Sequence, residues 1–180
     1  MLWAFWPEFL IIRRAGKNVR STDSPDAGSL RVILIGMQIV FFVSFPVSWM
    51  QSGRFPNNWD VAMFCIGLAL LIGGSLLRRH CWRMLGNSFT GDVQAYEGQE
   101  IVTRGAYRLL RHPSYTAGIL MYAGIGLGLG SWVSTLLLVI GSVITYAYRM
   151  IVEERALLSI VGEPYREFMR TRKRLIPYIF

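Results

Sequence analysis

Two adjacent glutamates, Glu153 and Glu154, follow an apolar segment that is nearly long enough to cross a membrane. On a helix turning about 100° per residue, Glu154 falls in the middle of an apolar stripe and Glu153 at its edge. Burying an unpaired carboxylate is costly, so both side chains need partners. Two interpretations are open. The pair is neutralised by arginines, with Arg149 one turn before Glu153 and loop arginines holding Glu154, or it faces a pocket for a polar or cationic ligand.

A second cluster, Arg-His-Pro-Ser-Tyr at 111–115, stands where another apolar segment begins. Proline suits the first turn of a helix, so Pro113 predicts a helix start. His112 and the backbone N–H groups that follow would then lie at a helix N-terminus, which favours a carboxylate or phosphate. The alternative is that His112 only starts the helix, and that Tyr107 and Tyr115 are aromatics of the membrane interface.

A third motif, Gly-Ile-Gly-Leu-Gly-Leu-Gly at 124–130, contains two pairs of glycines spaced four apart. This spacing favours close packing of helices in a membrane. A nucleotide-binding role is the less favoured interpretation, because no predicted strand precedes the glycines.

Four apolar runs must position these residues, at 30–50, 59–77, 114–130 and 132–148. A spanning helix needs about 20 mostly apolar residues, which the first two runs provide. The last two are shorter, are joined by Ser131 alone and predict a tight helical hairpin. Residues 1–12 predict an interfacial or partly inserted helix and a possible fifth crossing. The expected fold is all-α, a polytopic integral membrane protein with four to five transmembrane helices and a cytoplasmic C-terminal helical segment.

We divide the chain into residues 1–77, with the N-terminal helix and the first two spans, and residues 78–180, with the site. The connection 78–113 is long for a loop between helices but rich in apolar residues. It is therefore expected to fold against the membrane domain.

Composition supports a membrane protein, because 53% of the 180 residues are hydrophobic and only 17% are charged. The net charge is +8, and 18 of the 19 Lys and Arg residues fall on one side if the spans alternate. This pattern places the polar connection and the C-terminal tail in the cytoplasm, with the lipid bilayer rather than nucleic acid as the partner of the charge. Neither Cys65 nor Cys81 has a CxxC partner and the chain has only two histidines, so no metal is expected. A structural disulfide is not expected in this topology.

Four stretches occur in a familiar order: GNSFTGDVQ (86–94), IVTRGAYRLLRHPSYTAG (101–118), EERALLSIVGEPYREF (153–168) and RLIP (174–177). In these motifs the chain resembles the isoprenylcysteine carboxyl methyltransferase family of integral membrane enzymes. It resembles more loosely the phospholipid N-methyltransferases and the wider group that includes membrane sterol reductases. The matching region covers roughly residues 76–178, over half of the chain.

The resemblance implies methyl transfer from S-adenosylmethionine to a lipophilic acceptor, with the active site facing the cytoplasm. Carried over by position, the cofactor would be bound by Gln94, Val102, Thr103, Gly105, Tyr107, His112, Pro113, Tyr115, Gly118, Glu153 and Glu154. Arginines would pair with an anionic head on the substrate, and the candidates are Arg149, Arg172 and Arg174, with Arg170 in the same run.

The expected acceptor is a carboxylate on an isoprenylcysteine-like group, either a lipophilic small molecule or a prenylated substrate. Three alternatives remain within and beyond this class: an amine of a phospholipid, a thiol, or a nicotinamide-dependent membrane reductase using NADPH. A non-catalytic membrane scaffold is a further rival.

Overall fold

The computed structural model describes residues 29–85 and 101–176, and for residues 29–32 only the backbone. Within these ranges the regular structure is helical. The four long helices are α2 (Ser29–Ser48), α3 (Asp60–Leu85), α4 (Pro113–Gly128) and α5 (Trp132–Ile160), followed by the short α6 (Glu163–Thr171). Three short 3-10 helices are η1 (Gln51–Gly53), η2 (Asn57–Trp59) and η4 (Gly105–Arg108). The expected N-terminal helix at 1–12 and Gln94 lie outside the described residues.

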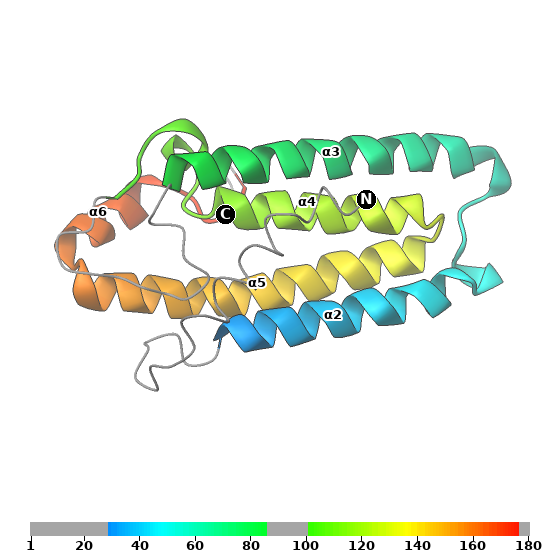
Figure 1. The fold of residues 1–180 in the computed structure, drawn as a ribbon, viewed down its shortest axis with the longest axis horizontal. Coiled ribbons are helices and arrows are strands. Elements are labelled where there is room, and N and C mark those ends of the chain that lie inside the picture. The colour runs from blue at the N-terminus through cyan, green and yellow to red at the C-terminus, as the bar shows by residue number, and fades with distance from the viewer. Residues whose placement is uncertain (1–28, 86–100, 177–180) are drawn as a thin grey trace.

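The long helices stand side by side in a row, in the order α3, α4, α5, α2 (Figure 1). Packing follows that order, because the main helix contacts join α3 to α4, α4 to α5 and α5 to α2. The turn between α4 and α5 is tight. Gly130 adopts a left-handed φ of 70°, and the Ser131 side chain caps α5 by accepting from the Ser134 N–H at 3.2 Å. The predicted hairpin is therefore confirmed.

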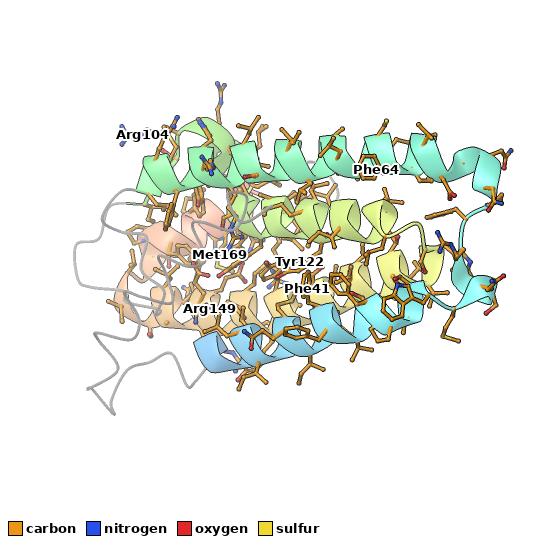
Figure 2. All side chains as sticks on the ribbon, turned by 45° about the vertical axis from the view of Figure 1, so that its right-hand side comes forward. Phe41, Phe64, Arg104, Tyr122, Arg149 and Met169 are labelled. Carbon is orange, nitrogen blue, oxygen red and sulfur yellow. The ribbon has the colours of Figure 1, made fainter. Side chains whose placement is uncertain are left out.

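Apolar side chains project from the row along its whole length (Figure 2). Two segments are long and apolar enough to cross a membrane, Asn57–Leu85 and Trp132–Ile160, and Ile33–Ser48 is a shorter apolar helix. Large exposed residues such as Phe42, at 69% exposure, and Ile144, at 65%, belong to these helices. Such surfaces are costly in water and ordinary against lipid. The all-α fold is confirmed.

Glycines bring the helix backbones into direct contact. A Cβ built on Gly124 of α4 would lie 2.5 Å from the carbonyl oxygen of Gly67 on α3, and one on Gly67 would lie 2.6 Å from that of Gly124. A Cβ on Gly126 would overlap the backbone of Thr135 on α5. The packing interpretation of the glycine motif is confirmed at these two positions. The backbone of Gly128 also lies against α3, because a Cβ on Gly67 would be 2.9 Å from its nitrogen, but a Cβ on Gly128 itself would meet nothing within 4 Å, so this packing does not require glycine there.

Two helices extend beyond the apolar runs that predicted them. α3 continues to Leu85, so the connection predicted at 78–113 begins later and the expected boundary at residue 77 falls inside a helix. α5 carries the last span and the predicted tail helix as one element, which ends before Gly162 at a φ of 73°. Only glycine adopts this φ without strain, and Pro164 then occupies the first turn of α6.

Candidate functional site

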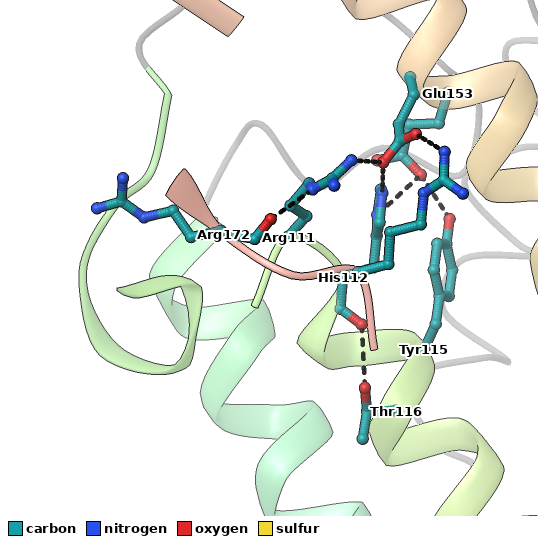
Figure 3. A network of polar contacts seen from close by, with 8 residues as sticks. Arg111, His112, Tyr115, Thr116, Glu153 and Arg172 are labelled. Atoms are coloured by element: carbon teal, nitrogen blue, oxygen red, sulfur yellow. Dashed lines mark hydrogen bonds and ion pairs between the residues drawn. The ribbon is translucent and has the colours of Figure 1, made fainter. Parts of the chain in front are cut away.

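Three segments meet at one end of the row: the residues leading into α4, the last turns of α5, and residues 172–176, which we call the C-terminal segment (Figure 3). α4 begins at Pro113 with His112 preceding it, as predicted. The polar residues gathered here form the carboxylate cluster, which comprises Arg111, His112, Tyr115, Glu153, Glu154 and Arg174.

Glu154 lies at the centre of the carboxylate cluster. Its Oε1 accepts from Nη1 of Arg111 at 2.8 Å and lies 3.2 Å from Nε2 of His112. Its Oε2 accepts from Nη2 of Arg174 at 2.9 Å. Only 5% of the side chain is exposed, so the carboxylate is buried but balanced by cations. The interpretation in which loop arginines hold Glu154 is confirmed.

Glu153 has different surroundings. Its Oε2 accepts from the hydroxyl of Tyr115 at 2.6 Å and lies 4.0 Å from Nδ1 of His112, which is too long for a hydrogen bond. Its side chain is 30% exposed. The pairing of Arg149 with Glu153 stays a prediction. Glu153 is therefore the carboxylate of the pair that can still reach a ligand.

Three rings lie in a stack between α4 and α5. The ring of His112 is 5.4 Å from that of Tyr115, which is 5.0 Å from Tyr146, with interplanar angles of 23° and 20°. Tyr146 occupies the space beside Gly118, where a Cβ would overlap its hydroxyl oxygen. The glycine at 118 is needed by this packing, and its predicted contact with a cofactor stays a prediction. Tyr146 itself was missed in the sequence.

The loop residues predicted for the cofactor are split between surface and interior. Thr103 and Gly105 are exposed, and Val102 is half-buried. Gly105 has a φ of 60°, and a Cβ there would lie 2.7 Å from Nε2 of His80. Tyr107 is buried against α3, and burial raises the pKa of its hydroxyl far above its usual value, with further contributions from Cys81 and Glu153. The Tyr107 phenol is therefore held neutral inside the protein.

The N-terminus of α4 is already occupied in part. The N–H of His112 donates to the carbonyl of Arg174 at 3.1 Å, and those of Tyr115 and Thr116 turn back to the carbonyl of His112. Pro113 has no N–H and is fully buried. An anion at this helix end stays a prediction, with fewer available donors than the sequence indicated.

The three arginines predicted to meet the substrate lie in different places. Arg174 is in the carboxylate cluster, with 35% of its side chain exposed. Arg172 directs its guanidinium away from the cluster, 5.3 Å from the ring centre of Phe168 on α6 (Figure 3). Arg149 is buried within α5. Of these three arginines, Arg174 is the one that reaches Glu154 from outside α5, and the substrate roles stay predictions.

Sequence reasoning also left Arg111 and Tyr165 without a role. Arg111 stood inside the motif at 111–115, so its proximity to His112 was a usable signal. Tyr165 of α6 is buried close to the glutamates. Burial first, then the charges of Glu153 and Glu154, raise the pKa of Tyr165 far above its usual value. α6 thus contributes a buried, neutral phenol close to the glutamates.

Within residues 29–85 and 101–176, no group of three His, Cys, Asp or Glu side chains is placed to hold a metal ion. Cys65 and Cys81 are both free, so no disulfide joins them, as predicted.

Comparison with known proteins identifies a matching family model and several relatives. The family model described as phospholipid methyltransferase matches residues 62–163. Protein-S-isoprenylcysteine O-methyltransferase B of Arabidopsis thaliana is 27% identical over 125 residues, which are 68% of this chain and 62% of that protein. The protein-S-isoprenylcysteine O-methyltransferase of Schizosaccharomyces pombe is 32% identical over 132 residues, 70% of this chain and 56% of that protein. The chain therefore spans less than two thirds of either relative.

The solved structure of a eukaryotic intramembrane Ras methyltransferase, isoprenylcysteine carboxyl methyltransferase, has a TM-score of 0.65 and 25% sequence identity. The match covers 99% of this chain and 63% of the other. These relatives confirm the resemblance seen in the sequence motifs. Since the matched family model covers more than half of the chain, the protein belongs to the phospholipid methyltransferase family of membrane enzymes, alongside the isoprenylcysteine carboxyl methyltransferases.

Proposed function

We propose that this protein transfers a methyl group from S-adenosylmethionine to a carboxylate on an isoprenylcysteine-like, lipophilic acceptor. The protein has four or five membrane spans, and the carboxylate cluster lies at the cytoplasmic end of the row. The positive-inside distribution of Lys and Arg supports this orientation.

The observation that carries the proposal is the state of Glu153. Its side chain is 30% exposed, and the described residues give it one short hydrogen bond, from Tyr115 at 2.6 Å. A carboxylate with acceptor capacity left suits the hydroxyls of a ribose and favours a nearby sulfonium cation. Apolar loop residues such as the half-buried Val102 suit an adenine ring. The residues present therefore fit the cofactor.

When bound, S-adenosylmethionine supplies a methyl group that is already activated by its positive sulfur. The protein then chiefly has to align the acceptor and exclude water. Tyr115 fixes the Glu153 carboxylate, and the buried rings of Tyr107 and Tyr165 keep their side of the site dry. A carboxylate acceptor is already deprotonated, so the proposed reaction needs no general base.

Arg174 is the favoured partner for the acceptor carboxylate. Its side chain, at 35% exposure, is more exposed than those of Arg111 and His112, and its contact with Glu154 holds it beside the site at 2.9 Å. An arginine fork matches a carboxylate in shape and charge. The lipophilic part of the acceptor would reach the site sideways from the bilayer, along the apolar surfaces of the row.

Methylation of a phospholipid amine is the second candidate, because the matching family model carries that description. Transfer to a thiol and an NADPH-dependent reduction remain weaker alternatives. Membranes supplied with cofactor labelled in the methyl group separate these reactions. We expect a base-labile, volatile label from a methyl ester, whereas an amine or thioether product would keep its label in base.

The cofactor is tested by titrating the detergent-solubilised protein with S-adenosylhomocysteine and following its melting temperature. We expect a saturable increase for the wild type, as binding to the folded state requires. Glu153→Gln should weaken the affinity about 10- to 100-fold, the range for losing a hydrogen bond to a charged group. Glu163→Gln is the control, since Glu163 is 63% exposed and pairs with Arg166 on α6. No increase for the wild type at millimolar ligand would refute the assignment.

A further inference from the structure

The two adjacent glutamates differ too much in their surroundings to share one role. Glu154 has both carboxylate oxygens engaged and 5% of its side chain exposed, whereas Glu153 is 30% exposed. We propose that Glu154 is a positioning residue that fastens the C-terminal segment across the start of α4, and that Glu153 alone of the pair faces the ligand. The ligand role of Glu153 rests on the proposed function, but the fastening role of Glu154 does not.

The C-terminal segment lies along the residues that lead into α4. Lys173 and Leu110 form a parallel β-bridge. The N–H of Arg111 donates to the carbonyl of Lys173 at 2.8 Å, and that of His112 donates to Arg174 at 3.1 Å. The bond from His112 satisfies a backbone donor at the start of α4, and the bond from Arg111 satisfies one in the loop before it.

Side chains add two further attachments to this backbone pairing. Nε of Arg111 donates to the carbonyl of Arg172 at 2.9 Å, and the Thr116 hydroxyl donates to that of Leu175 at 2.7 Å. Leu175 is 7% exposed, so the segment is also packed. Within the described residues, all of these contacts join the segment to α4 or to the loop before it.

Glu154 connects this assembly to α5. One oxygen binds Arg111 of the loop and the other binds Arg174 of the C-terminal segment, while the carboxylate itself comes from α5. Removing its charge takes away the carboxylate that the guanidinium groups of both Arg111 and Arg174 contact. Breaking one side of a buried ion pair is costly for this reason. The segment is then expected to open while the helices stay packed.

Opening of the C-terminal segment would also displace Glu153, because His112 connects Glu154 to the residues that hold Glu153. Its Nε2 lies 3.2 Å from Glu154, and its ring stacks on Tyr115, whose hydroxyl holds Glu153. Glu154 therefore sets the position of Glu153 without touching the ligand. Replacing Glu154 should weaken ligand binding only because the segment and His112 move.

Hydrogen–deuterium exchange on the full chain without ligand tests the fastening. In Glu154→Gln, we expect the backbone amides of Arg111 and His112 to exchange at least about tenfold faster than in the wild type. Glu153→Gln is the matched control and should leave their exchange unchanged. Exchange in the contact of α3 with α4 should stay constant in both variants, which excludes general unfolding. Unchanged exchange of these amides in Glu154→Gln would overturn the proposal.

A cross-link separates positioning from direct contact. Leu110→Cys and Lys173→Cys are at bridged positions and can form a disulfide on oxidation with copper phenanthroline, in a Cys65→Ser background. In Glu154→Gln, oxidation should restore the affinity for S-adenosylhomocysteine to within about threefold of the cross-linked wild type. The reduced protein provides the reference.

Oxidation should not restore the affinity of Glu153→Gln, because that variant lacks the ligand contact itself. If the oxidised Glu154→Gln protein stays as weak as its reduced form, Glu154 contacts the ligand and the division of roles is wrong. If the wild type does not bind S-adenosylhomocysteine, the proposed function fails, and the exchange experiment still decides whether Glu154 fastens the segment.

Discussion

Gly118 offers a direct test of how the rings between α4 and α5 hold the site. In Gly118→Ala, the new Cβ would overlap the Tyr146 hydroxyl and lie 2.9 Å from two ring carbons. Carbon atoms at contact need about 3.5–4.0 Å, so the ring must move by about 0.6–1 Å. Tyr146 is 4% exposed and is stacked on Tyr115 at 5.0 Å, so the movement is passed on.

The consequence for Tyr115 can be estimated from its hydrogen bond. A similar displacement would stretch the 2.6 Å bond to Glu153 towards about 3.2–3.6 Å, where a hydroxyl hydrogen bond is largely lost. We expect overpacking to lower the free energy of unfolding by about 1–3 kcal/mol. The affinity for S-adenosylhomocysteine should fall about tenfold, which corresponds to about 1.4 kcal/mol.

Thermal unfolding in detergent and isothermal titration measure these two effects. Gly128→Ala is the control on the same helix, because a Cβ there meets nothing within 4 Å and alanine favours a helix. Tyr146→Phe removes the atom that the new Cβ overlaps. In the double variant, Gly118→Ala should therefore cost at least about 0.5 kcal/mol less than in the wild-type background. Additive effects, or a Gly118→Ala protein that behaves like Gly128→Ala, would refute this reasoning.

Two further predictions concern ligand binding at the site and the packing of the helices that carry it. Tyr115→Phe should weaken S-adenosylhomocysteine binding about tenfold in a titration, because the Glu153 carboxylate loses its hydrogen-bond donor. Tyr148→Phe is the control and should have no effect, because Tyr148 of α5 is 42% exposed. Gly124→Ala should lower the free energy of unfolding by about 1–3 kcal/mol, because its Cβ would lie 2.5 Å from the Gly67 carbonyl oxygen. If Gly124→Ala lowers the free energy of unfolding no more than Gly128→Ala does, the packing argument is contradicted.

The sequence was most informative where one local pattern determines one local structure. Proline at 113 set the start of α4, the lone Ser131 set the hairpin, and the apolar stripe around Glu154 set the inward face of α5. The end of α3 was not predicted, because polar residues follow its apolar run. Arg78 is nevertheless buried, and its Nη1 donates to the carbonyl of Ser114 at 3.0 Å, a contact no local pattern contains.

The sequence identified several residues of the site but not the hydrogen bonds and ion pairs between them. The glutamate pair and His112 were identified, but the partners of Glu154 are 43 and 20 residues away in the sequence, at Arg111 and Arg174. Such pairings depend on how segments meet in space. Tyr146 had a usable signal, because it lies seven residues before Glu153 and hence on the same face of α5.

Because the helices are arranged in a row, an outer helix can be replaced with less disturbance than an inner one. α2 packs chiefly on α5, and the matched family region begins only at residue 62, after α2 has ended. A different hydrophobic helix in its place would change the contact with the outer side of α5 and leave the contact between α4 and α5 intact. Chimeras that exchange this outer helix should therefore keep the chemistry, whereas grafts that divide the inner pair should lose it.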